Sequence, residues 1–187
     1  MKPDFFHKIV QISSDEVTKS MKKISPFQFL ILNIIIPLTA GSISYLLTGN
    51  SFSVYSQFKQ PPFAPAPIVF PIVWTILYIL MGIATYLVIL STDKIPVTKA
   101  YDPLPDAQKA LLLYSISLSL NILWSPVFFR LGWHFGALII LAALWYFVFQ
   151  TYSAYKKINR TAGILFIPYI LWCTYAFYLN FGIVILN

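Results

Sequence analysis

The chain has 187 residues, of which 58% are hydrophobic and only 10% are charged. A soluble domain of this length could not cover so much apolar surface, so the composition indicates an integral membrane protein. The net charge of +7 does not point to nucleic acid, because the basic residues are spread over loops and one tail, where they suit an anionic membrane surface.

The chain divides into a polar start and a long apolar remainder. Residues 1–26 have mixed charge and no apolar core of the kind a signal peptide needs, so we expect a polar N-terminal tail or a helix lying on the membrane surface. The remainder, 27–187, forms the membrane domain. Its apolar segments are long enough to cross the hydrocarbon layer, at about 27–47, 68–91, 107–129, 132–153 and 162–186.

Each span must be helical, because lipid offers no partner for unpaired backbone groups. The predicted fold class is therefore an all-α membrane protein, a five-transmembrane-helix bundle with a proline-rich loop between helices 1 and 2. The third and fourth spans are separated only by Arg130 and Leu131, which predicts an antiparallel hairpin. Residues 153–161 join the fourth span to the fifth, and the charged segment 92–106 is expected in water.

The loop at 48–67 is the most distinctive segment. Five prolines fall within 61–71, and proline removes backbone donors and restricts the preceding residue, so this part cannot be ordinary helix. It runs directly into the second span. We interpret it as a stiff lid at the membrane surface, over a site held between helices.

The basic residues predict the orientation. If the spans alternate, eleven Lys and Arg side chains lie on the side of the N-terminal tail and two on the other. Basic residues collect on the cytoplasmic side. The N-terminus is therefore expected in the cytoplasm, with the loop 48–67 and the C-terminus outside.

Several classes of site are excluded by what the spans lack. No acidic residue follows Asp106, which removes carboxylate metal sites, proton relays and paired-acid hydrolysis. Two histidines and one cysteine are too few for a metal site or a disulfide, and no nucleophile motif is present. We therefore predict no metal site, no cofactor and no conventional catalytic site.

The spans instead contain neutral polar groups among aromatic rings. Asn121 and Trp124 share one face of the third span, and Trp172 and Ala176 share one face of the fifth. Such a set is either bundle core or the wall of a cavity for a flat apolar ligand. Ser115 and Ser119 similarly fit either packing within one chain or a homodimer face on helix 3.

These residues resemble the translocator proteins, also called tryptophan-rich sensory proteins or peripheral benzodiazepine receptors. The second span resembles the family pattern P-V-W-T-x-L-Y-x-x-M-G through 72–78 and 81–82. The third resembles L-x-L-N-x-x-W-x-P-x-F-F through 118–129, and further matches occur at 132–133 and 168–180. The resemblance covers about 37–181.

The resemblance implies a five-helix bundle, often dimeric, that binds porphyrins, benzodiazepine-type compounds and, in some members, sterols. Carried over by position, it places the following residues in the ligand site: Tyr55, Pro61, Val69, Trp74, Asn121, Trp124, Phe128, Trp133, Trp172, Ala176 and Leu179. The departures point to a less polar cavity, since Ser117 replaces a common glutamine and Ala137 a frequent acidic residue. The C-terminal sterol-recognition pattern is absent.

Three functions remain open at this point. The first is a receptor or transport-type protein for porphyrins or other apolar ligands. The second, which the family is suspected of, is an enzyme that degrades bound porphyrin with light and oxygen, with Trp74 and Trp172 as redox candidates. The third is an assembly protein whose aromatic residues are only core.

The predicted orientation can be tested directly. A reporter fused to the C-terminus should be active only outside the cytoplasm, because the eleven-to-two distribution of basic residues favours that side. A C-terminal reporter found in the cytoplasm would contradict both the number of spans and the orientation.

Overall fold

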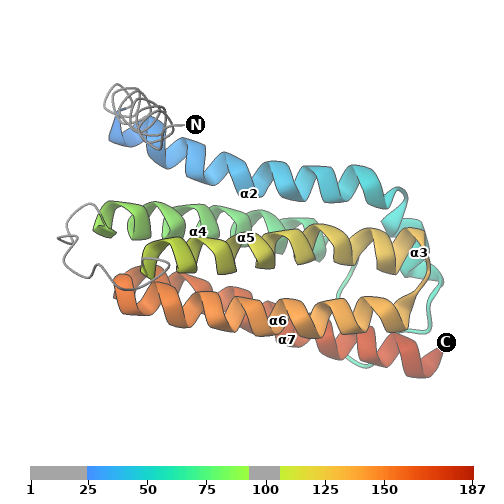
Figure 1. Ribbon diagram of the computed structural model, residues 1–187. Coiled ribbons are helices and arrows are strands. Elements are labelled where there is room, and N and C mark those ends of the chain that lie inside the picture. Colours follow the sequence, from blue (N-terminus) through green and yellow to red (C-terminus); the bar gives the residue numbers. More distant parts are fainter. Residues whose placement is uncertain (1–24, 93–105) are drawn as a thin grey trace, which may run out of the picture.

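The structure is a computed structural model that describes residues 25–92 and 106–187 (Figure 1). All but the last two residues of the predicted 1–26 tail, and most of the predicted 92–106 loop, lie outside the described residues. All regular secondary structure in the described residues is helical, with no strand. Its elements are α2 (Pro26–Thr48), α3 (Ser51–Gln57), α4 (Val69–Thr92), α5 (Asp106–Ser125), the π-helix η1 (Pro126–Arg130), α6 (His134–Ile158) and α7 (Arg160–Leu186).

Five of these helices are long and apolar enough to span a membrane, with η1 counted as the continuation of α5. This confirms the predicted five-helix membrane bundle. α6 packs between α5 and α7, while α2 packs mainly against α4 and lies on the opposite side of the bundle (Figure 1). The C-terminus and α3 share one end of the bundle, called the α3 end below.

Two connections differ from the predicted boundaries. The loop 48–67 contains the helix α3, which precedes the prolines and therefore meets no steric obstacle. The link from α6 to α7 is only Asn159 and not 153–161. The helix continues because Tyr155 is fully buried and because Lys156 and Lys157 suit a helix C-terminus. Asn159 then caps α7 by accepting a hydrogen bond from the Ala162 N–H at 3.0 Å.

A proline at the end of the third span explains how α2 is attached to α5. Pro126 has no N–H, so the carbonyl of Ile122 has no donor one turn further along its own helix. The Ser44 hydroxyl of α2 donates to this carbonyl at 3.1 Å. One turn on, the hydroxyls of Thr48 and Ser125 lie 2.8 Å apart. One hydroxyl-to-carbonyl hydrogen bond and one pair of hydroxyls therefore hold α2 against α5 at the α3 end.

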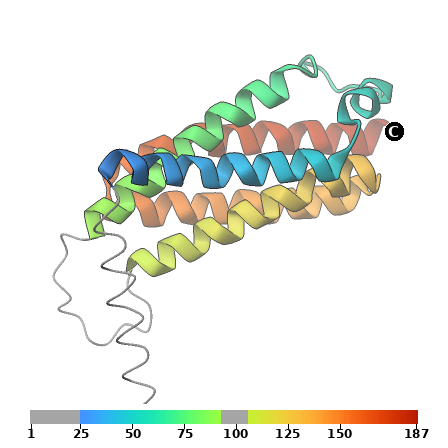
Figure 2. The same cartoon turned by 90° about the horizontal axis from the view of Figure 1, so that it is seen from above.

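A second attachment joins α2 to α4 further from that end. A Cβ added at Gly82 would lie 2.5 Å from the Ile34 Cα and 2.6 Å from the Asn33 carbonyl oxygen, so the two backbones meet here. The Asn33 carbonyl is the one that Pro37 leaves without its helical donor. Only a residue without a side chain permits this approach. Beyond the crossing, α4 and α2 separate toward α3 (Figure 2).

Candidate functional site

A cavity of about 420 Å³ occupies the space that the diverging helices leave. This volume lies in the range of small-molecule sites, about 300–1,000 Å³. Its walls come from α2, α4 and α5, and α3 with the end of the loop closes the α3 end. The lining residues are Leu38, Gly41, Ser42, Ser44, Tyr45, Leu46, Ser51, Phe52, Tyr55, Pro67, Phe70, Pro71, Trp74, Thr75, Tyr78, Asn121, Trp124, Ser125 and Phe129.

The polar part of the cavity centres on Asn121. Its amide oxygen accepts a hydrogen bond from the Tyr78 hydroxyl at 2.7 Å, and its amide nitrogen donates to the Tyr169 hydroxyl at 2.9 Å. The three side chains are buried and come from three different spans. One amide therefore joins α4, α5 and α7 in a region where unpaired polar groups are costly.

An aromatic cluster forms the adjoining wall. The Trp74 ring stacks on Tyr78 with centroids 5.6 Å apart, and it meets Tyr169 and Trp172 edge-on at 6.0 Å and 6.4 Å. The Trp172 indole N–H is buried and has no acceptor in the described part of the chain. The cluster holds four oxidisable rings, of which Trp74 and Tyr78 line the cavity, and one unused donor behind them.

A second, much smaller cavity shares part of its lining with the main cavity. It has a volume of about 20 Å³, close to the space that one water molecule needs. Ala176, Leu179 and Phe128 line it. Its remaining lining residues include four that also line the main cavity, namely Tyr55, Phe70, Trp124 and Phe129. These four side chains therefore form the partition between the two cavities.

Seven of the eleven predicted ligand-site residues line one of the two neighbouring cavities. Tyr55, Trp74, Asn121 and Trp124 line the main cavity, whereas Phe128, Ala176 and Leu179 line only the small one. The last four, which line neither cavity, are Pro61, Val69, Trp133 and Trp172.

These four residues have different surroundings. Pro61 packs against Gly182 of α7, and Trp172 supports the aromatic wall from behind. The Val69 side chain is half-buried, at the first residue of α4. Trp133 is 60% exposed and covers Gly136 at the turn into α6.

Sequence reasoning missed the contribution of α2 altogether. Gly41, Ser44 and Tyr45 all line the main cavity, as does Phe70 at the start of α4. The small residues at 40, 41 and 44 are one signal that could have identified this face, since small side chains mark close helix packing. No such signal marked Phe70, whose role follows only from its place between the two cavities.

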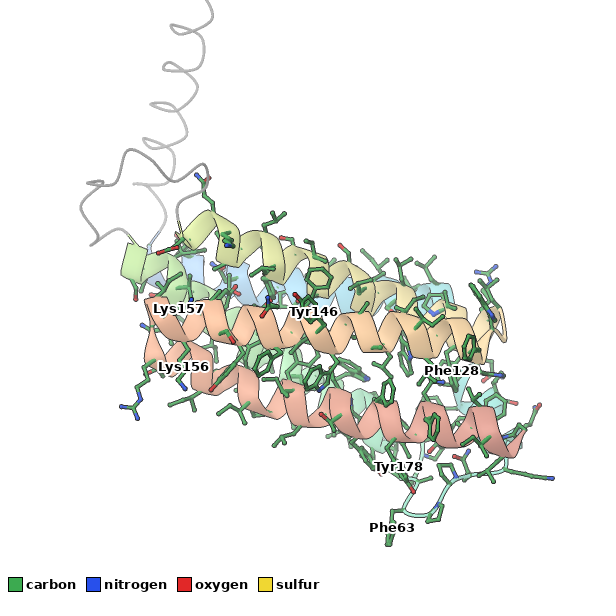
Figure 3. All side chains as sticks on the ribbon, turned by 60° about the horizontal axis from the view of Figure 1, so that its bottom comes forward. Phe63, Phe128, Tyr146, Lys156, Lys157 and Tyr178 are labelled. Carbon is green, nitrogen blue, oxygen red and sulfur yellow. The ribbon has the colours of Figure 1, made fainter. Side chains whose placement is uncertain are left out.

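The proline-rich segment is tied to α7. The Tyr175 hydroxyl donates to the Phe63 carbonyl at 2.6 Å and the Tyr178 hydroxyl to the Pro62 carbonyl at 2.8 Å. Asn187 pairs with both backbone groups of Lys59, at 2.9 Å and 3.2 Å. Figure 3 shows Phe63 pointing away from the bundle, and its side chain is 90% exposed.

Tyr55 connects the loop to the cavity. Its hydroxyl donates to the Pro65 carbonyl at 3.2 Å, and its ring meets Phe70 edge-on at 5.0 Å. Burial, with a smaller contribution from Tyr175, raises the pKa of Tyr55 to about 12. The hydroxyl therefore stays protonated at neutral pH and acts as a donor.

No three His, Cys, Asp or Glu side chains lie close enough together to hold a metal ion within 25–92 and 106–187. The predicted dimer residues Ser115 and Ser119 are exposed on α5. Their hydroxyls donate to carbonyls of their own helix at 2.9 Å, so they do not serve packing within the described bundle.

Comparisons with a family model and with individual proteins all indicate the same family. The sequence matches the TspO/MBR family over residues 33–186. It is 35% identical to the tryptophan-rich sensory protein of Cereibacter sphaeroides over 151 residues, which cover 81% of this chain and 84% of that protein. It is 33% identical to the protein CrtK of Rhodobacter capsulatus, covering 75% and 84%, and 26% identical to the translocator protein of Ovis aries, covering 79% and 83%.

The Asn121 bridge makes a testable prediction about stability. Asn121→Leu leaves the hydroxyls of Tyr78 and Tyr169 without their partner and should lower the free energy of unfolding by about 1–2 kcal/mol. Adding Tyr78→Phe to this variant should cost much less than Tyr78→Phe alone, because one unpaired hydroxyl is removed. Thermal unfolding in detergent measures both effects, with Ser56→Ala as the neutral control, because Ser56 is exposed and bonds only to its own helix. Strictly additive losses would show that the side chains do not act as one unit.

Proposed function

The chain belongs to the TspO/MBR family of membrane proteins, and from this premise we propose that it is a receptor or transport-type protein that binds porphyrins and other flat apolar molecules. The observation that carries the proposal is the cavity between α2, α4 and α5. It combines broad indole and phenol faces with a few neutral donors and acceptors.

The chemistry of the walls suits such a ligand. Trp74, Trp124 and Phe70 offer ring faces or edges against which a macrocycle can pack, and aromatic pairs add about 0.5–1.5 kcal/mol beyond the area they bury. No Asp, Glu, Lys, Arg or His lines the cavity. The walls therefore favour an uncharged ring system over an ion. Charged substituents on a porphyrin would have to remain at the open side.

The structure supports a second candidate function, light-driven degradation of bound porphyrin. Trp74 lies at the cavity wall and is surrounded by Tyr78, Tyr169 and Trp172, which are all oxidisable. Under this hypothesis the porphyrin absorbs the light and oxygen is the oxidant. No acid–base or metal site is then required of the protein.

We also retain the proposed homodimer and orientation. The exposed small residues Ser115 and Ser119 would allow the α5 helices of two copies to approach closely. In the proposed orientation, the α3 end faces outward and the link at Asn159 faces the cytoplasm.

A titration with protoporphyrin IX tests binding. In the dark, the porphyrin should quench tryptophan fluorescence in a saturable manner. Trp74→Phe should weaken binding by about 1 kcal/mol, roughly fivefold in Kd, because the ring becomes smaller and loses its N–H. The control Trp145→Phe, on the exposed face of α6, should leave Kd unchanged. Quenching that never saturates would contradict a binding site.

Illumination of the same samples separates the two functions. A receptor should bleach the porphyrin no faster than detergent or lipid alone. Faster bleaching by the wild type that disappears in Trp74→Phe, at concentrations where this variant is saturated, would favour the enzyme.

A further inference from the structure

The main cavity is open on the side between α2 and α4, where several of its lining residues are exposed. Ser42, Tyr45 and Leu46 of α2 are exposed, the last two at 61% and 77%, as is Thr75 of α4. Both helices are membrane spans, so side chains on this side face lipid. The cavity therefore has a mouth, defined here by Ser42, Tyr45 and Thr75.

The mouth lies at the depth of the lipid chains. Ser42 is six residues before the end of α2, and Thr75 is six residues after the start of α4. At 1.5 Å per residue, both lie about 9 Å inside the ends of their helices. The hydrocarbon layer is about 30 Å thick, so the mouth opens into its apolar part and not into water.

The geometry of the two helices produces this mouth. α2 and α4 meet at Gly82, and α2 is held to α5 near Ser44 and Thr48. The Tyr78 ring of α4 still packs on Gly41 of α2, and beyond this contact α4 turns away from α2 toward the α3 end (Figure 2). In the described residues, no third helix fills the gap at this level, because α3 lies beyond the helix ends.

The alternative route from water runs past the proline-rich loop and is held shut. Four hydrogen bonds hold residues 59–63. Two come from the stacked rings of Tyr175 and Tyr178 in α7, and two join Lys59 to Asn187 directly after α7. Pro61 additionally packs where a Cβ at Gly182 would stand. To open this route, the loop would have to lose all these contacts together.

We propose that ligands enter the cavity sideways from the bilayer, through the mouth between α2 and α4, and not from the aqueous face past the loop. The inference rests on the proposed function. It restricts the ligand class to apolar ring compounds that first dissolve in the membrane. It also gives the proline-rich loop a different role, that of a fixed end wall instead of a moving lid.

Two crosslinks test the route. Ser42→Cys with Thr75→Cys, bridged by a reducible bifunctional thiosulfonate, closes the mouth. Pro62→Cys with Tyr178→Cys, bridged by the same reagent, fixes the loop to α7. The native Cys173 is buried and stays in place. Association of protoporphyrin IX is followed by stopped-flow tryptophan quenching in phosphatidylcholine vesicles, before and after reduction of each bridge.

The bridged mouth should slow association and dissociation at least tenfold, and reduction should restore both rates. The bridged loop should leave both rates within twofold of the reduced sample. Slower kinetics with the loop bridged, or unchanged kinetics with the mouth bridged, would overturn the proposal.

A second measurement keeps the route testable even if the porphyrin does not bind, which would refute the proposed function alone. Ser44→Cys places a thiol on the buried cavity wall. In vesicles it should react faster with a membrane-soluble aryl maleimide than with a charged maleimide, and a Trp at Thr75 (Thr75→Trp) should slow the membrane-soluble reagent. Faster reaction with the charged reagent would overturn entry from the bilayer.

Discussion

Lipid supplies no hydrogen bonds to the backbone, and this constraint decides where α2 sits. Pro126 deprives the Ile122 carbonyl of its helical donor, and Ser44 of α2 supplies one. Pro37 similarly frees the Asn33 carbonyl, against which Gly82 packs. The prolines thus act as attachment points between spans as well as interruptions within them. With α2 fixed at both places and α4 turning away toward the α3 end, the space left over is the cavity.

The lack of hydrogen-bond partners in lipid also determines the polar contacts inside the bundle. A buried amide or hydroxyl in a membrane bundle must find a partner, and Asn121 provides one for two tyrosines at once. The Trp172 N–H, one of the buried polar groups without a partner in the described residues, stands behind the wall formed by Trp74 and Phe70. Stability and recognition therefore draw on the same few polar groups. A ligand acceptor that reached Trp172 would complete the pairing.

The sequence predicted the spans well, because their apolar character depends on composition that tertiary packing does not alter. The end of the fourth span was predicted too early, because the charged residues Lys156 and Lys157 were assigned to a loop. They lie in the last turn of α6. Of the aromatic residues that line the main cavity, Tyr55, Trp74 and Trp124 were predicted from the family resemblance, whereas Phe70 was not. The cavity-lining face of α2 was not predicted, because its attachment depends on a carbonyl that Pro126 frees in α5 and on the close approach of Gly82 in α4.

The central claim is that the ligand occupies the cavity between α2, α4 and α5 at the α3 end. Photolabelling tests it most directly, with an apolar aryl diazirine analogue in vesicles and peptide mapping by mass spectrometry. The account predicts saturable adducts within 38–46 and 67–78, which unlabelled porphyrin removes by competition. Saturable adducts on the lipid-facing side of α6, with none in these two segments, would contradict it.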